Sequence, residues 1–215
     1  ISCESLSASA LLMGSARCPA RRIWVETESF IRPTLPENAP AKSAMSTAFF
    51  THLECRGHDM GRGHPESPQR LVAIEDHLLA IGLESTLSRR EAPLVELKHV
   101  EFAHTAGYVS QLSDLLEGVA RTGNPRALDP DTSASAGTWA AVRRGAGAAV
   151  AATQGVLAGE FDNAFCAVRP PGHHATRGRA MGFCFFNNVA IAARYALDVG
   201  GLTRGAGLDL GNVRF

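Results

Sequence analysis

The sequence lacks any apolar run long enough to span a bilayer, which takes about 20 residues. The strongest candidates, "AGAAVAAT" and "IAARYAL", are too short, and Arg194 interrupts the second. An excess of charge of either sign is also missing, because 21 basic residues balance 21 acidic ones. A neutral chain has no general electrostatic attraction to nucleic acid or to an anionic membrane. We therefore expect neither as a direct partner.

Paired cysteine motifs are absent as well. The five cysteines are an odd number and include no CxxC pair, which argues against a disulfide framework or a zinc ribbon. Cys166 and Cys184 lie in apolar surroundings and are interpreted as buried thiols. We expect a reducing, cytoplasmic compartment.

The first part of the chain has little hydrophobic periodicity. Residues 1–46 are rich in Ser, Ala, Arg and Pro, and the first residue is Ile1 rather than Met. Patterned sequence starts directly after Met45. We predict a disordered or non-native leader over residues 1–44 and one truncated domain over 45–215.

The remainder has the pattern of an α/β domain. Ser67 and Pro68 are predicted as the N-cap and first residue of a helix that Gly82 ends. Apolar spacing predicts further helices at 105–119, 137–157 and 188–199, and strands at 47–50, 161–168 and 205–210, with turn-rich loops at 51–66 and 123–137. Helices that alternate with buried strands indicate a parallel sheet. We expect strands 161–168 and 205–210 to be parallel, joined by the helix at 188–199.

Two adjacent histidines follow the predicted strand 161–168. Pro170 and Pro171 end that strand and stiffen the turn, and Gly172 allows unusual backbone angles. Sites in parallel sheets gather at the carboxyl ends of strands, where His173 and His174 could act as general base and general acid. The plain alternative is a surface or capping pair of histidines.

A second motif, "GFCFFNN", lies eight residues after His174. It sets large apolar side chains beside the polar histidine pair, a mixture that ligand pockets require. The alternative for these aromatic residues is ordinary core packing.

The two motifs together resemble the signature of the histone deacetylase superfamily, "RPPGHHA" followed by "GFCFFNNVAIAA". Class II and bacterial acetylpolyamine amidohydrolase-like members are the most similar. Three further segments resemble the family in the same order, "HDMGRGHPESPQRL", "FAHTAGYVSQL" and "LDPDTSASAGTWAA". The resemblance implies a three-layer open parallel sheet with helices on both faces, of the arginase/deacetylase type and incomplete here. It also implies zinc-dependent hydrolysis of acetyl-lysine or acetylated polyamines.

Roles for individual residues follow from the resemblance alone. It implies that His173 orients the attacking water and that His174 acts as general base and then acid. Phe183 matches an aromatic wall of the acyl-lysine tunnel, and Gly182 lies beside the acyl group. Asp131 matches a rim aspartate that holds the substrate backbone, and capping of the turn before the next helix is an equal alternative for it.

The family pattern breaks at "GLDLGNVRF". Asp209 matches a carboxylate that supports the first tandem histidine and helps hold a structural monovalent cation. The resemblance places two zinc ligands at the next positions, which are Gly211 and Val213 here, and the remaining ligand and an oxyanion-stabilising Tyr after Phe215. Catalytic zinc needs about three protein ligands, so we assign no metal ligand and expect no turnover. A non-catalytic remnant that binds a ligand or partner is the alternative.

Three histidines recur at six-residue spacing, His52, His58 and His64. A metal cluster is one hypothesis for them, but the resemblance places no zinc there. We expect hydrogen bonds within the loop instead, with His64 and Glu66 bracing the rim of the site. A His-rich module unrelated to the family is disfavoured by the ordered motifs.

Overall fold

A computed structural model describes residues 10–12, 22–25, 29–31, 46–202 and 206–208. A five-stranded sheet forms its centre, in the order β3-β2-β8-β4-β5. The strands are β2 (Arg22–Val25), β3 (Ser29–Ile31), β4 (Thr47–Thr51), β5 (Leu87–Glu91) and β8 (Asn163–Cys166). All neighbouring pairs are parallel except β2 and β3, which are antiparallel. The predicted parallel sheet is therefore present.

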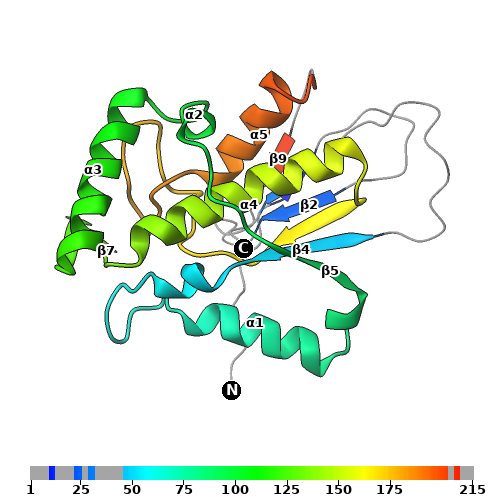
Figure 1. Ribbon diagram of the computed structural model, residues 1–215, viewed down its shortest axis with the longest axis horizontal. Helices are drawn as coiled ribbons and strands as arrows, with labels where there is room; N and C mark the ends of the chain where they lie inside the picture. Colours follow the sequence, from blue (N-terminus) through cyan, green and yellow to red (C-terminus); the bar gives the residue numbers. More distant parts are fainter. Residues whose placement is uncertain (1–9, 13–21, 26–28, 32–45, 203–205, 209–215) are drawn as a thin grey trace.

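Helices cover the sheet on both sides. Figure 1 shows α1 (Gln69–Ala80) on one side of the strands, and α4 (Thr138–Ala158) with α5 (Asn188–Asp198) on the other. The core beneath them combines the aromatic side chains of β4 with the buried alanines of α4. This arrangement confirms a three-layer α/β fold. No helix in the described part of the chain is both long and apolar enough to cross a membrane.

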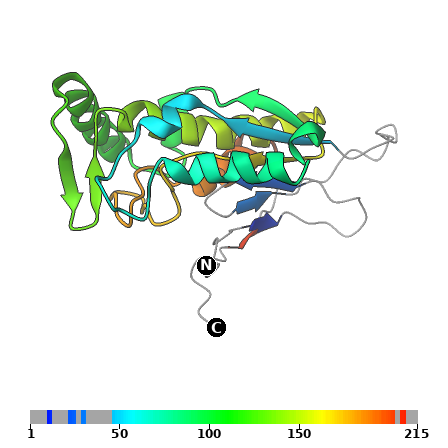
Figure 2. The ribbon, with the colours of Figure 1, turned by 90° about the horizontal axis from the view of Figure 1, so that it is seen from below.

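A second hydrophobic cluster lies at the end of α4 that is nearer to its N-terminus. Here α3 (Ala106–Thr122) packs on α4 beside the short α2 (Leu97–Val100) and a hairpin of β6 (Arg126–Asp129) and β7 (Thr132–Ala134). Figure 2 shows the hairpin at the opposite end from β2 and β3. The chain that follows β8 runs toward this end, so the hairpin and the turn after β8 share one region.

The predicted helices are confirmed with small changes at their ends. Thr105 caps α3 by accepting a hydrogen bond from the Tyr108 N–H at 3.3 Å. The first helix begins one residue later than predicted, with Pro68 rather than Ser67 at the N-cap. Gly82, at φ 72°, ends that region as expected.

The expected parallel pairing of 161–168 with 205–210 is wrong. The second segment contains β9 (Ala206–Leu208), which pairs antiparallel with β1 (Ala10–Leu12) in a separate two-stranded sheet. Strand β8 has two hydrogen-bonding edges, and β4 and β2 occupy them. No edge of β8 is left for β9 to join.

Local predictions failed where strands are short. The segment predicted as a loop at 123–137 contains the β6–β7 hairpin. Strand β5 was not predicted, because its sequence "LSRRE" lacks the apolar alternation of a buried strand. Most of this strand is exposed. Among the described residues there are also two 3₁₀ helices, η1 (Leu53–Gly57) and η2 (Glu84–Thr86). The disordered leader over 1–44 stays a prediction, since most of it lies outside the described residues and the described parts are β1, β2 and β3.

Candidate functional site

The turn that carries the tandem histidines leaves the carboxyl end of β8. The Ala167 N–H still donates to the Phe50 carbonyl of β4 at 2.8 Å, and the chain then departs from the sheet. Gly172 lies so close to the segment before α5 that an added Cβ would stand 2.5 Å from the Phe186 carbonyl oxygen and 2.6 Å from the Asn188 nitrogen. Only glycine fits there, so the turn is held against the start of α5.

The two histidine rings lie together at the end of this turn. The ring centroids of His173 and His174 are 4.1 Å apart at an interplanar angle of 62°, and both residues are partly exposed. The His174 N–H donates to the Cys184 Sγ at 3.4 Å. Gly182, at φ 58°, lies directly against His174, and an added Cβ would stand 2.8 Å from its ring. His173, His174 and Gly182 therefore lie together at the end of the turn.

A single asparagine ties the histidine turn to α5. The Asn187 side chain donates from Nδ2 to the Ala175 carbonyl at 3.0 Å and to the His173 carbonyl at 3.4 Å. Its Oδ1 accepts from the Ala190 N–H at 3.0 Å and caps the helix. Its backbone N–H donates to Nε2 of His104 at 2.9 Å. Burial lowers the pKa of His104, which keeps that nitrogen available as an acceptor.

Phe183 connects the site to two rim segments. It adopts φ 68°, unusual for a residue with a side chain, and its N–H donates to the buried Thr132 hydroxyl at 3.0 Å. Its ring meets that of His64 edge to face, with centroids 4.6 Å apart. The rim therefore consists of the loop before α1, the β6–β7 hairpin and the 182–183 segment.

Asp131 lies in the turn of that hairpin and is exposed. Its carboxylate accepts from the Thr132 hydroxyl at 3.3 Å, and its N–H donates to Asp129 Oδ1 at 3.0 Å. Because Thr132 also contacts Phe183, the hairpin turn lies beside the rim. The N-cap of α4 is Gly137, which makes no side-chain hydrogen bond, and both the rim role and the turn-capping role of Asp131 stay predictions.

A buried ion pair lies directly before the histidine turn. The Arg169 guanidinium donates from Nε and one terminal nitrogen to the two oxygens of Glu66, at 2.7 and 2.6 Å. The other terminal nitrogen donates to the carbonyls of Cys55 and His58, both at 3.0 Å. The Arg169 and Glu66 side chains are only 2% and 3% exposed. This Arg169–Glu66 pair fastens the loop before α1 to the end of β8.

Of the three N-terminal histidines, His52 and His64 form hydrogen bonds within the loop as expected, whereas His58 bonds to a residue of α4. Nδ1 of His52 accepts from the Glu54 N–H at 3.1 Å, and Nδ1 of His64 accepts from the Glu66 N–H at 3.1 Å. His58 is fully buried with Nδ1 2.8 Å from the Thr138 hydroxyl. Burial, with the nearby Arg169 charge, lowers the pKa of His58 to about 3, so its ring is neutral.

Several residues that build the site were not predicted from the sequence. They are Glu66 as the partner of Arg169, and Asn187 with His104 as the clamp on the turn. The available signal was an arginine directly after a buried strand, a position where a charge needs a partner. Asp209, Gly211 and Val213 lie outside the described residues. Within the described residues no three His, Cys, Asp or Glu side chains are grouped to hold a metal ion.

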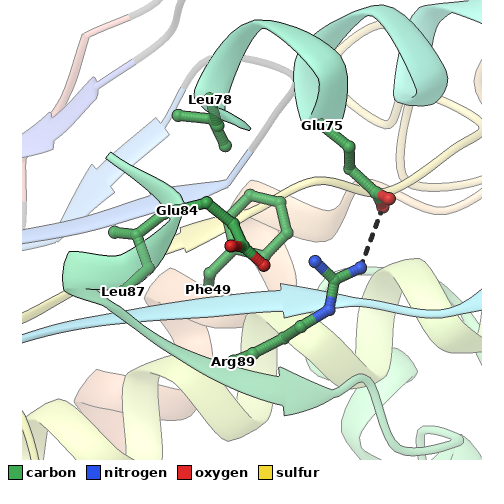
Figure 3. Close-up of a pocket in the computed structure, with 6 residues that line it drawn as sticks. All are labelled: Phe49, Glu75, Leu78, Glu84, Leu87 and Arg89. Carbon is green, nitrogen blue, oxygen red and sulfur yellow. Dashed lines mark ion pairs between the residues drawn. The ribbon is translucent and has the colours of Figure 1, made fainter. Parts of the chain in front are cut away.

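A separate small cavity lies between α1 and the β4–β5 edge (Figure 3). Its apolar floor includes Phe49 and Leu78, and Arg89 and Glu75 pair across it at 3.2 Å. None of the residues that line it belongs to the histidine site.

The helix-covered parallel sheet, with its site at a strand end, defines an α/β fold of the arginase/deacetylase type. The family model described as the histone deacetylase domain matches residues 64–210. This match covers more than half of the chain, and the chain therefore belongs to the histone deacetylase family. The crystal structure of the HDA15 HD domain is similar at a TM-score of 0.66 and 30% identity, over 73% of this chain and 45% of that one.

Curated relatives give the same assignment. A histone deacetylase-like amidohydrolase of Pseudomonas aeruginosa is 37% identical over 68% of this chain and 37% of its own length. A protein of Mus musculus named polyamine deacetylase HDAC10 is 39% identical over 65% of this chain and 21% of its own length. The chain thus spans less than half the length of these relatives.

Proposed function

We propose that the histidine site belongs to a zinc-dependent deacetylase that hydrolyses acetyl-lysine or acetylated polyamines. The observation that carries the proposal is the pair of imidazoles 4.1 Å apart at the end of β8, with Gly182 directly against His174. Membership of the histone deacetylase family supports this chemistry. The relatives, a histone deacetylase-like amidohydrolase and a polyamine deacetylase, support both substrate classes.

Each site residue has a proposed role in amide hydrolysis as a family member with a complete zinc site would carry it out. His174 removes a proton from water as the water oxygen attacks the acetyl carbonyl, and His173 orients that water. The carbon–nitrogen bond then breaks, and His174 gives its proton to the leaving amine, which yields acetate and a free amine. Gly182, which has no side chain and lies directly against His174, lines the place of the acyl group. Phe183 forms an apolar wall, and the exposed carboxylate of Asp131 accepts hydrogen bonds from the substrate backbone.

The residues present do not fit the zinc ion that the family uses. The side chains at the two expected ligand positions, Gly211 and Val213, carry no donor atom. The described residues supply no group of three ligands elsewhere. Zinc would otherwise polarise the carbonyl and lower the pKa of water. We therefore propose that this chain turns over no acetyl-amide by itself and acts as a non-catalytic member that retains the acyl site.

Two finer assignments belong to the same proposal. Asp209 would support His173 and help hold a monovalent cation. A reducing compartment such as the cytoplasm suits Cys55, Cys166 and Cys184, which are all buried.

Ligand binding and turnover test the proposal separately. We expect an N-acetyl-lysine amide to shift the nuclear magnetic resonance signals of His174 and Phe183, and unacetylated lysine amide to leave them in place. Equal shifts from both ligands would contradict an acyl site. In parallel, metal content and acetate release from an acetyl-lysine peptide and from an acetylated polyamine are measured. One bound zinc with chelator-sensitive release of acetate would contradict the proposed inactivity.

A further inference from the structure

The histidine turn is held from two sides, and neither of the two anchors has a role in the proposed chemistry. Asn187 holds the side that follows the histidines, through the carbonyls of His173 and Ala175. Arg169 holds the side that precedes them. Only three residues separate Arg169 from His173, and two of these are prolines whose φ angles are fixed. We therefore expect a displacement of Arg169 to move the histidines as well.

The same guanidinium also fixes the rim. Its four hydrogen bonds all end on the loop before α1, at Glu66 and at the carbonyls of Cys55 and His58. Glu66 in turn donates its N–H to His64, whose ring lies on Phe183. The chain of contacts runs without a gap from Arg169 to the aromatic wall of the site.

We infer that Arg169 is a positioning residue that sets His174 and the His64–Phe183 pair relative to one another through its pairing with Glu66. The inference rests on the proposed function, because only an acyl site at the histidines requires His174 and the His64–Phe183 pair to keep this relative position. Arginine suits this task and lysine does not, since a planar guanidinium can bridge two carboxylate oxygens and two carbonyls at once. A single ammonium group cannot hold all four acceptors.

A stabilising role alone is the competing explanation. Breaking a buried ion pair by removing one partner is strongly destabilising wherever the pair lies. Loss of stability therefore does not distinguish the two roles. The position of the histidine rings in the folded protein does, because a merely stabilising pair leaves the remaining folded molecules unchanged.

The test compares Arg169→Lys with Arg89→Lys in the full chain. Arg89 also pairs with a glutamate, Glu75, at 3.2 Å, but half of its side chain is exposed and it lies in the separate cavity of Figure 3. Ring signals of the histidines are recorded by nuclear magnetic resonance on samples that retain native dispersion. We expect Arg169→Lys to move the signals of His174 and His64 and to leave that of the exposed His77 in place. Arg89→Lys is expected to move neither His174 nor His64.

Amide exchange supplies a second measurement. We expect amides of the rim loop, residues 57–66, to exchange about 100-fold faster in Arg169→Lys than in the unmodified chain. Local opening of the loop must break all four hydrogen bonds of the Arg169 guanidinium in the unmodified chain, but fewer bonds in the variant. Arg89→Lys is expected to leave them unchanged. Neither measurement depends on turnover, so an inactive chain still gives a clear answer, and failure of the proposed function is recognised separately by ligand binding.

Unmoved signals of His174 and His64 in folded Arg169→Lys, with only a lower midpoint of thermal unfolding, would show a stabilising role alone. If Arg169→Lys does not fold, Glu66→Gln keeps the volume of the partner and is measured in the same way. Loss of the fold in both variants would also overturn the inference, since the pair would then be a requirement of the whole domain.

Discussion

Acid is expected to destabilise this protein through one buried histidine. His58 is fully buried, and its pKa is lowered from 6.5 to about 3 by burial and by the Arg169 charge. The Glu66 carboxylate lies 3.4 Å from its Nε2, but both carboxylate oxygens already accept from Arg169. In the unfolded chain His58 regains its ordinary pKa. Between pH 6.5 and pH 3 the unfolded chain therefore binds a proton that the folded chain does not.

The sign and size of the effect follow from this difference. A folded-state pKa below the unfolded one means that the stabilising contribution is complete above pH 6.5 and declines as pH falls toward 3. Each unit of pH in that window costs about 1.4 kcal/mol, so the change from pH 7 to pH 5 removes about 2 kcal/mol from the free energy of unfolding. The lowered pKa of His104 acts in the same direction.

Urea unfolding at pH 7 and pH 5 measures the change. His58→Gln keeps a hydrogen-bonding side chain and removes the titrating group. Between pH 7 and pH 5 we expect its free energy of unfolding to fall by about 2 kcal/mol less than that of the unmodified chain. The control is His77→Asn on α1, which replaces an exposed histidine and is expected to retain the slope of the unmodified chain. An equal loss of stability in His58→Gln and in the unmodified chain would refute the argument.

Three further predictions concern the site and the leader. Gly182→Ala forces a side chain to φ 58° and against His174, so we expect a loss of about 1–3 kcal/mol and a moved His174 ring signal, whereas Gly178→Ala, with open space around it, is expected to do neither. Asn187→Ala removes a helix cap and the clamp on the turn, and thermal unfolding should show a loss of at least about 1 kcal/mol. Limited proteolysis is expected to cut within residues 1–44 before the rest of the chain, and the opposite order would contradict a disordered leader.

Elements with strong local patterns could be predicted from the sequence. The helices α3 and α4 carry their apolar spacing, capping residue or small residues within one continuous segment. Strand β5 has no such signal, because an exposed edge strand needs no apolar face. The failure at β9 has another cause, since pairing depends on which edges other strands have already taken. Local sequence contains no information on that competition.

The site shows the same division between local and distant information. His173, His174 and Gly182 could be proposed from the sequence because their motifs are contiguous, with Pro170, Pro171 and Gly172 forming the turn beside them.

Their surroundings were not found, because Arg169 and Glu66 are 103 residues apart in the sequence. An arginine directly after a buried strand predicts that a carboxylate pairs with it, but the sequence does not identify which of the 21 acidic residues is that partner. Only the fold brings the loop before α1 over the end of β8. It follows that a motif search on this chain recovers the groups proposed for chemistry and misses the groups that hold them in position, so variants at Arg169 and Asn187 test the site more severely than further variants within the motif.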